Sequence, residues 1–161
     1  MKIEIKHRYT DSVIWTCEDA IDFRDALQKA AVLKVNLSGS DLSGSDLSGS
    51  DLSYSDLSYS DLSGSDLSYS NLSGSNLRGS DLSGSNYGDS KIKSILQTGP
   101  IGSRKDYSVC YNTDNGLIVH VGCFRDTMEK FKEAVEKTHG ESKHGRDYRA
   151  WINLCEEWSK E

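Results

Sequence analysis

The side chains that could bind a metal ion lie in the last third of the chain. They are two cysteines and three histidines, namely Cys110, His120, Cys123, His139 and His144. Zinc takes such ligands, but structural zinc sites usually contain a close pair such as Cys-x-x-Cys or His-x₃₋₅-His, and only His139 and His144 approach that spacing. We therefore predict no metal site, and we interpret Cys123 as a small buried apolar residue.

No residue pattern typical of an enzyme stands out. The chain lacks a glycine-rich phosphate-binding loop, a His-Glu-x-x-His motif and a nucleophile elbow. Serine is abundant, but it recurs so regularly that no single serine is favoured as a nucleophile. We expect a protein without catalytic activity and without a cofactor.

Carboxylates are the other chemically active groups, and they are concentrated in residues 36–89. This segment carries eight aspartates and one arginine, a charge of −7, whereas the whole chain carries −6. The acidic surface therefore belongs to one segment. Its charges could imitate the phosphates of duplex DNA, or they could serve only the local structure and the solvation of the chain.

The aspartates belong to a tandem repeat of five residues. From Asn36 the chain reads NLSGS, DLSGS, DLSGS, DLSYS, DLSYS, DLSGS, DLSYS, NLSGS, NLRGS, DLSGS and NYGDS. Leucine recurs at Leu37, Leu42, Leu47, Leu52, Leu57, Leu62, Leu67, Leu72, Leu77 and Leu82. A period of five fits neither an α-helix nor a flat strand, so these leucines share one face only if the chain turns a corner every five residues.

This pattern resembles the pentapeptide-repeat family, in which a small residue, Asp or Asn, Leu or Phe and a polar residue recur. The resemblance covers about a third of the chain. It implies a mainly β fold, a right-handed quadrilateral β-helix of about three coils with the leucines on its axis. Serine replaces the usual alanine at the small inward position from Ser40 to Ser85. An unpaired buried hydroxyl costs roughly 1–3 kcal/mol, so we expect these serines to bond to the backbone or to each other.

Four repeats per coil place leucines of successive coils above one another, about 4.8 Å apart. The predicted stacks are Leu37, Leu57 and Leu77; Leu42, Leu62 and Leu82; Leu47, Leu67 and Tyr87; and Leu52, Leu72 and Ile92. The ends of such a stack need covering, because exposed backbone edges recruit other chains.

Residues 1–31 are predicted to cover the first coil with a ββα unit, and the β-helix is predicted over 32–95. A turn at Thr10-Asp11-Ser12 separates two alternating stretches, and Asp19 is the predicted N-cap of the helix. The apolar face of the hairpin is predicted to contain Ile3, Ile5, Tyr9, Val13, Trp15 and Cys17, and that of the helix Ala20, Phe23, Leu27 and Ala30.

Residues 103–161 are predicted to form a C-terminal ββαα module after a hinge at residues 99–102. Asp114-Asn115-Gly116 is predicted as a three-residue turn, which places Tyr107, Val109 and Tyr111 opposite Cys123, Val121 and Val119, and Cys110 opposite His120. One helix is predicted from a capping box at Asp126 to Gly140. A last helix is predicted to contain Tyr148, Trp151, Ile152, Cys155 and Trp158. The module resembles one seen in phage-encoded proteins, which points to a phage or a bacterium.

The chain shows no signal peptide, and no apolar run approaches the roughly 20 residues that cross a membrane. Four cysteines without close spacing indicate free thiols rather than a disulfide framework. We therefore expect a protein of the cytoplasm, in a bacterium or a phage-infected host cell.

Asp41, Asp61 and Asp81 are predicted to form an acidic column, flanked by Asp46 and Asp66 on the next side. At strand spacing, eight charges over three coils give one per roughly 1.8 Å, against about 1.7 Å in duplex DNA. The resemblance adds that some pentapeptide-repeat proteins imitate duplex DNA and occupy gyrase. A stack of three coils spans only about four base pairs, which argues against gyrase itself.

Tyr54, Tyr59 and Tyr69 replace the glycine of other repeats, and exposed tyrosines either anchor interfaces or shield neighbouring corners. We call these tyrosines and the five aspartates above the Asp–Tyr belt. We predict a non-catalytic protein-interaction module that binds a protein partner through this belt or the C-terminal module, and binds neither nucleic acid nor membrane. The alternative is a DNA mimic that inhibits a host DNA-binding enzyme, a topoisomerase or a defence nuclease.

Overall fold

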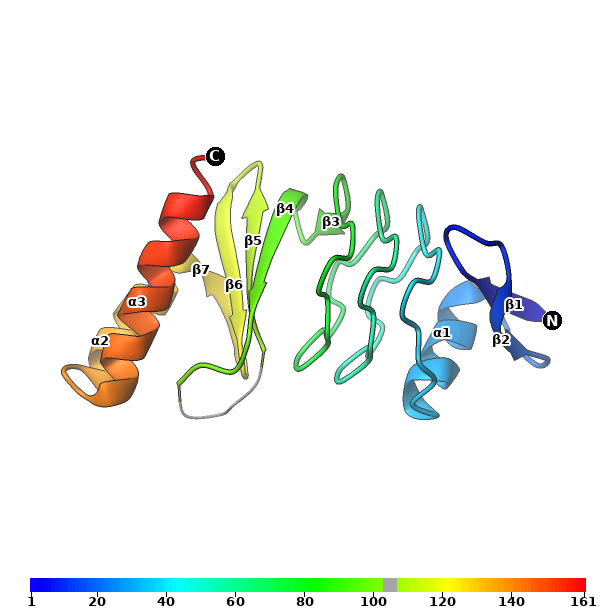
Figure 1. The fold of residues 1–161 in the computed structure, drawn as a ribbon, viewed down its shortest axis with the longest axis horizontal. Coiled ribbons are helices and arrows are strands. Elements are labelled where there is room, and N and C mark those ends of the chain that lie inside the picture. Colours follow the sequence, from blue (N-terminus) through cyan, green and yellow to red (C-terminus); the bar gives the residue numbers. More distant parts are fainter. Residues whose placement is uncertain (103–106) are drawn as a thin grey trace.

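A computed structural model describes residues 1–102 and 107–161. The molecule is elongated, and an N-terminal unit, a stack of repeat turns and a sheet with two helices follow one another along its long axis (Figure 1). The predicted start of the C-terminal module at residue 103 lies outside the described residues. Within those residues no helix is both long and apolar enough to cross a membrane.

The N-terminal unit has the predicted ββα order. Strand β1 (Ile3–Lys6) pairs antiparallel with β2 (Val13–Cys17), and helix α1 (Phe23–Val32) follows. The predicted N-cap was wrong, because the Asp22 carboxylate, and not that of Asp19, accepts the hydrogen bond from the first turn at the N–H of Asp25. Asp19 forms an ion pair with Lys29 instead, at 3.2 Å.

The predicted apolar face of the hairpin was wrong at two positions. The side chains of Tyr9 and Val13 are 77% and 48% exposed. The alternation of buried residues does not continue past β1, because the register shifts between Ile5 and Lys6 and the chain then turns. Ile5 and Cys17 are buried as predicted.

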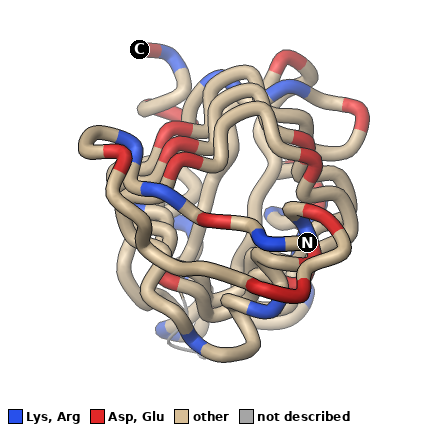
Figure 2. Tube along the Cα trace, turned by 90° about the vertical axis from the view of Figure 1, so that its right-hand side faces the viewer, with Lys and Arg blue, Asp and Glu red and all other residues tan. Residues whose placement is uncertain are grey.

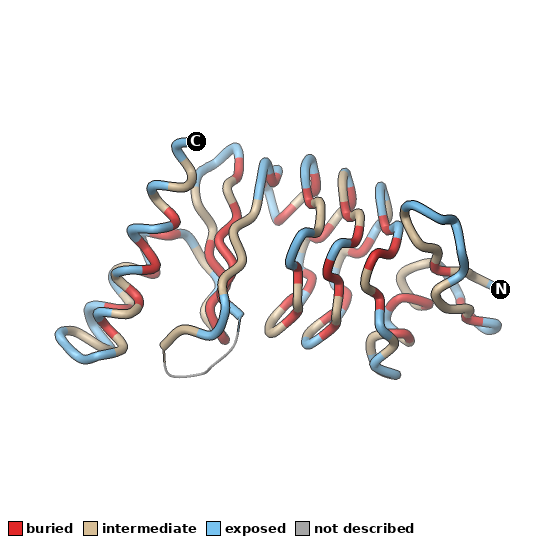
Figure 3. The backbone as a smooth tube through the Cα atoms, viewed as in Figure 1, coloured by how far each residue is buried: buried red, intermediate tan, exposed pale blue. Residues whose placement is uncertain are grey.

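The repeat segment returns beside itself every 20 residues. Parallel bridges join Asp41 to Asp61 and Asp61 to Asp81, and the same spacing joins Asp46, Asp66 and Asn86. A turn occurs in every five residues, and all ten leucines are at most 2% exposed. They form one continuous apolar core that runs through the stack, and its buried positions recur along each winding (Figure 3).

Most of the inward serines find backbone partners, as expected, but the buried hydroxyls of Ser40 and Ser55 have none among the described residues. The hydroxyls of Ser50, Ser65 and Ser70 donate to leucine carbonyls at 2.7–2.8 Å, three residues earlier in the chain. Ser65 and Ser85 also lie 3.3 Å apart, oxygen to oxygen, in successive coils. Leucine carbonyls that also accept the N–H of the same serine therefore satisfy most of these buried hydroxyls.

The stack ends one corner earlier than predicted, at Tyr87. Strand β3 (Asn86–Tyr87) turns at Gly88-Asp89 into β4 (Ser90–Thr98), which runs antiparallel to it. Ile92 is buried, but its N–H donates to Ser85 and its carbonyl accepts from Gly84, both in the preceding coil segment. The predicted place of Ile92 in the fourth stack was therefore wrong, because the chain reverses before it reaches that corner.

The C-terminal part contains more strands than predicted. Strands β5 (Ser108–Thr113), β6 (Gly116–Val121) and β7 (Phe124–Thr127) complete a five-stranded antiparallel sheet in the order β3-β4-β5-β6-β7. Helices α2 (Met128–His139) and α3 (Lys143–Trp158) follow. The predicted ββαα layout was wrong because it lacked β7. This strand is too short for an alternation of apolar and polar residues to be recognised in the sequence.

The predicted register of the C-terminal hairpin was wrong by one residue. Val109 lies opposite His120, and Cys110 lies opposite Val119. Only Asp114 and Asn115 form the turn, because Gly116, with φ of 109°, already pairs with Thr113 as the first residue of β6. A change of one residue in the turn moves every pairing of a hairpin.

Strand β5 separates two apolar cores. Val109 and Tyr111 face the core of the repeat, whereas Cys110 on the other face belongs to the core that α2 and α3 complete. Thr127, and not the predicted Asp126, is the N-cap of α2, and Gly140 ends that helix as predicted. The sheet thus packs the repeat on one face and two helices on the other (Figures 1 and 3).

Candidate interaction surface

The aspartates of the repeat have a local structural task. Each carboxylate accepts a hydrogen bond from the backbone N–H two residues later, as Asp41 does from Ser43 at 3.1 Å and Asp61 does from Ser63 at 2.9 Å. Asn71 accepts the same bond from Ser73 at 3.1 Å. Asp and Asn are therefore interchangeable in this task, because only one side-chain oxygen is used.

The same bonds lower the pKa values of three of these carboxylates. The Ser48 hydroxyl and then its backbone N–H lower the pKa of Asp46, and the same groups of Ser53 lower the pKa of Asp51. The backbone N–H of Ser83, followed by its hydroxyl, lowers the pKa of Asp81. A carboxylate that accepts hydrogen bonds in its charged form titrates below its ordinary range.

The predicted acidic columns come together in space. Asp41, Asp61 and Asp81 are bridged in one column, and Asp46 and Asp66 in the next. Seen along the long axis, acidic positions of successive windings lie above one another (Figure 2). The repeat aspartates therefore form regular columns of negative charge.

Two arginines of the N-terminal unit contact these aspartate columns, and no sequence pattern predicted either contact. The guanidinium of Arg8 lies 3.4 Å from Asp61 and also donates to the carbonyls of Tyr59 and Ser60. The guanidinium of Arg24 lies 3.1 Å from Asp46. Neither arginine is near its partner in sequence, so no local pattern could have revealed the pairs. They reduce the net charge of both columns.

The three tyrosines of the belt stay exposed, with Tyr54 at 73%, Tyr59 at 52% and Tyr69 at 84%. Their backbones take the left-handed conformation that glycine takes in the other repeats, with φ of 57° to 60°. The ring of Tyr54 lies over Gly74, where an added Cβ would be 2.5 Å from it. The rings therefore cover the backbone of the next coil and still present a face to solvent.

The third tyrosine, Tyr69, borders a hollow in the surface. Tyr69, Tyr87, Ile118 and Arg125 line it, where the repeat meets the sheet. The guanidinium of Arg125 lies 4.3 Å from the centre of the Tyr87 ring and donates to the Ser70 carbonyl at 2.6 Å. Burial raises the pKa of Tyr87 to about 12, so its ring is neutral and available for this cation–π contact.

The structure does not assemble the five candidate metal ligands. Cys110 is buried and faces Val119, whereas Cys123 is exposed in the turn after β6, so the prediction that it is buried was wrong. Burial lowers the pKa of His120 to about 4, and the rings of His139 and His144 lie 6.1 Å apart. Among the described residues no three His, Cys, Asp or Glu side chains are placed to hold one ion.

The comparisons with known proteins identify the repeat. The family described as Pentapeptide repeats (8 copies) matches residues 34–68 and 45–84. The middle third of the chain is thus a pentapeptide-repeat segment, and this repeat implies a β-helix.

One solved structure is similar, that of alr5209, a pentapeptide repeat protein from Nostoc Pcc 7120. The two are 28% identical over 42% of this chain and 66% of that protein, with a TM-score of 0.16. The chain therefore spans 66% of the length of that relative. A comparison with curated proteins gives no match.

Proposed function

We propose that the protein is a non-catalytic protein-interaction module built on a right-handed, four-sided β-helix of about three coils. Three observations support the scaffold. The chain turns in every five residues, residues 20 apart are bridged in parallel, and the ten leucines are buried together. A chain that turns at this interval and returns after 20 residues has four sides.

We propose that unit 1–31 covers one end of this β-helix, and that β4 together with unit 103–161 covers the other end, where the stack stops at Tyr87. At the first coil, the N–H of Asp41 donates to Lys6 and the N–H of Arg8 donates to Gly39, both at 2.8–2.9 Å. The carbonyl of Lys6 thus takes the place of a carbonyl of a preceding coil, since the N–H of Asp61 donates to Ser40 in the same way within the stack. An edge that is paired in this way no longer offers a template for another chain.

At the other end a glutamine side chain supports the covering role. The Gln97 amide oxygen accepts from the N–H of Leu77, and its nitrogen donates to the carbonyl of Ser75, both at 2.7 Å. Within the stack, the equivalent groups of Leu57 and Ser55 bond to the backbone C=O and N–H of one residue of the next coil, Asn76. The side-chain amide of Gln97 therefore supplies the acceptor and the donor that a residue of a further coil would supply.

The observation that favours an ordinary protein interface is the exposure of large aromatic side chains on a polar scaffold. Tyr54 and Tyr69 are 73% and 84% exposed, and tyrosine is a common anchor of interfaces. The aspartates of the belt also have a structural task of their own, and Asp46 and Asp61 are ion-paired within the chain. The Asp–Tyr belt is thus proposed to bind a protein partner chiefly through its tyrosines.

The second candidate is a DNA mimic that occupies a host DNA-binding enzyme. The bridged column of Asp41, Asp61 and Asp81 favours it, because regular carboxylates at strand spacing approach the charge density of a duplex. The short stack and the ion pairs with Arg8 and Arg24 weigh against it. Four free cysteines suit the reducing cytoplasm, where either activity would take place.

Two variants distinguish these functions against one partner captured from bacterial lysate. Changing Asp41, Asp61 and Asp81 to Asn removes three charges and the ion pair of Asp61 with Arg8, but it keeps the backbone bond, because Asn71 already makes it. Changing Tyr54 and Tyr59 to Gly removes the aromatic anchors and keeps a residue suited to positive φ. We expect the tyrosine variant to lose more affinity. A loss of roughly 3- to 100-fold from the Asn variant that shrinks with salt would instead establish mimicry.

A further inference from the structure

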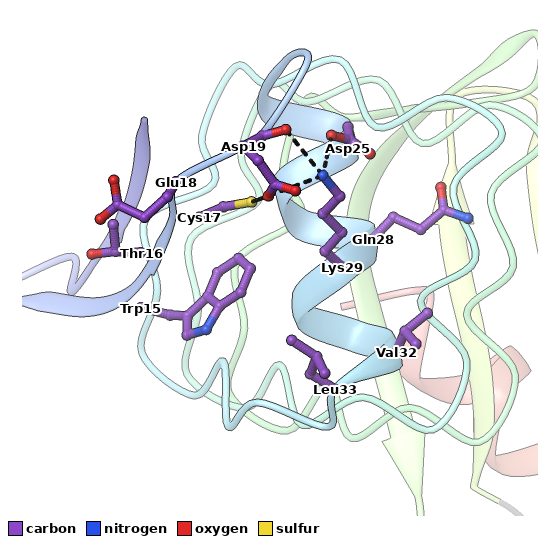
Figure 4. Close-up of a pocket in the computed structure, with 10 residues that line it drawn as sticks. All are labelled: Trp15, Thr16, Cys17, Glu18, Asp19, Asp25, Gln28, Lys29, Val32 and Leu33. Atoms are coloured by element: carbon purple, nitrogen blue, oxygen red, sulfur yellow. Dashed lines mark hydrogen bonds and ion pairs between the residues drawn. The ribbon is translucent and has the colours of Figure 1, made fainter. Parts of the chain in front are cut away.

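A groove runs along the outside of the N-terminal unit, between β2 and α1 (Figure 4). Its volume is about 550 Å³, within the range of sites that take a small ligand or several side chains. The residues that line it include Trp15, Glu18, Asp25, Lys29, Val32 and Leu33. None of these residues belongs to the Asp–Tyr belt.

The backbone edge of β2 borders this groove. Residues 15–18 are consecutive, and successive side chains of a strand point to opposite faces. Thr16 and Glu18 point to the opposite side of β2 from Trp15 and Cys17 (Figure 4). Since residues of both faces line one groove, the groove follows the edge of the strand. In the described part of the chain β2 pairs only with β1, so the edge beside the groove has no strand partner.

Apolar side chains occupy one part of the groove. Val32 and Leu33, at the end of α1, are 75% and 66% exposed, and Trp15 lies across from them. Solvent-facing aliphatic side chains beside an open strand edge provide a seat for an apolar side chain of an added strand.

Carboxylates occupy the other part. Glu18, Asp19 and Asp25 face a single cation, Lys29, whose ammonium lies 3.2 Å from Asp19 and 3.1 Å from Asp25. Lys2, which precedes β1, pairs with Glu4 at 2.9 Å and also interacts with the charge of Glu18. This part of the groove therefore has an excess of negative charge, which attracts a basic side chain.

We propose that this groove binds an extended segment of a partner protein, which pairs with β2 as an additional strand and presents an apolar residue next to a lysine or arginine. The main-chain hydrogen bonds come from the open edge of β2. The apolar residue contacts Trp15, Val32 and Leu33, and the basic residue contacts the carboxylates. Main-chain pairing gives such complexes their affinity and the side-chain seats give them specificity.

The test uses the full chain and a displayed library of random 12-residue peptides, followed by affinity measurements on synthetic copies of the enriched peptides. We expect enriched peptides to combine an apolar residue with a basic one. Val32→Lys places a cation in the apolar part and should weaken binding about ten-fold or more. Ile21→Lys is the matched control, because Ile21 is 79% exposed and does not line the groove.

A chemical variant of the peptide tests the strand pairing itself. In an added strand, backbone N–H groups of one parity face β2 and those of the other face solvent. Methylating alternate peptide nitrogens should therefore abolish binding for one parity and spare it for the other. The proposal would be overturned if methylation at the two parities changed the affinity equally. It would also be overturned if Val32→Lys bound the peptides with unchanged affinity, or if the library yielded no enriched peptides. Dimerisation of the chain that Val32→Lys abolishes would overturn it too, because a second copy would then be the occupant.

Peptide binding at the groove can be tested separately from partner binding at the Asp–Tyr belt. The Asn variant of Asp41, Asp61 and Asp81 and the Gly variant of Tyr54 and Tyr59 leave the groove unchanged. Enriched peptides should bind both variants as they bind the parent chain, and a loss with either variant would place the peptides on the belt and overturn the proposal.

Discussion

The ring of Tyr54 lies directly on the bare backbone of Gly74, one coil further along the chain, where a Cβ would come within 2.5 Å of the ring. Gly79 has the same relationship to Tyr59, at 2.7 Å. A tyrosine at the corner of one coil is thus compatible with a glycine, and with no larger residue, above it.

We expect Gly74→Ala to lower the free energy of unfolding more than Gly64→Ala does. Both glycines have left-handed backbones, with φ of 68° and 66°, so both variants incur about 1–2 kcal/mol of backbone strain. Only Gly74 faces a ring, which adds about 1–3 kcal/mol of overpacking. Urea unfolding of both variants measures the difference. Adding Tyr54→Gly to Gly74→Ala should remove the excess, and equal losses in the two single variants would contradict the contact.

Removing the side-chain amide of Gln97 should destabilise the end of the stack. Gln97→Leu leaves the N–H of Leu77 and the carbonyl of Ser75 without their partner, at a cost of about 1–3 kcal/mol. Gln28→Leu is the matched control, since Gln28 is exposed and is the only other glutamine of the chain. Equal unfolding midpoints for the two variants would show that the side-chain amide of Gln97 does not replace the backbone donor and acceptor of a further coil.

Acid should destabilise the fold through the aspartates of the repeat. The pKa values of Asp46, Asp51 and Asp81 are lower in the folded chain than the ordinary value of 3.8. A lowered folded pKa contributes stability above the unfolded pKa and loses it as the pH falls through the folded pKa. Unfolding free energies from urea titrations should therefore decline below about pH 4. Changing these three residues to Asn should make the decline shallower, and an unchanged pH profile would contradict this account.

Deleting residues 1–31 should cause aggregation. The deletion frees the N–H of Asp41 from Lys6 and removes Ile5 and Leu27 from the apolar core of the stack. Open edges and exposed leucines favour association with other chains. Light scattering and size-exclusion chromatography measure this outcome. A stable, monomeric truncated chain would show that the N-terminal unit does not cover the first coil.

The repeat was predictable because every unit obeys the same local rule. Leucine every five residues predicts a corner in each repeat, and the family resemblance implies four repeats per winding; the 20-residue spacing of the bridges agrees with both. The C-terminal register was missed because the turn at Asp114-Asn115 has one residue fewer than the pattern indicated. Arg8, Arg24 and Gln97 were missed for another reason. Each bonds to a residue at least 20 positions away, so its task exists only after the chain has folded.

Repeat number also sets the orientation of the two ends. Because residues 20 apart lie side by side, one pentapeptide advances the chain by a quarter of a winding. Inserting a single repeat would rotate the C-terminal sheet and helices by about 90° relative to the N-terminal groove, with almost no change in length. Inserting four would restore the angle and separate the ends by about 4.8 Å. A scaffold of this kind can adjust the angle between two binding surfaces in coarse steps and the distance between them in fine ones.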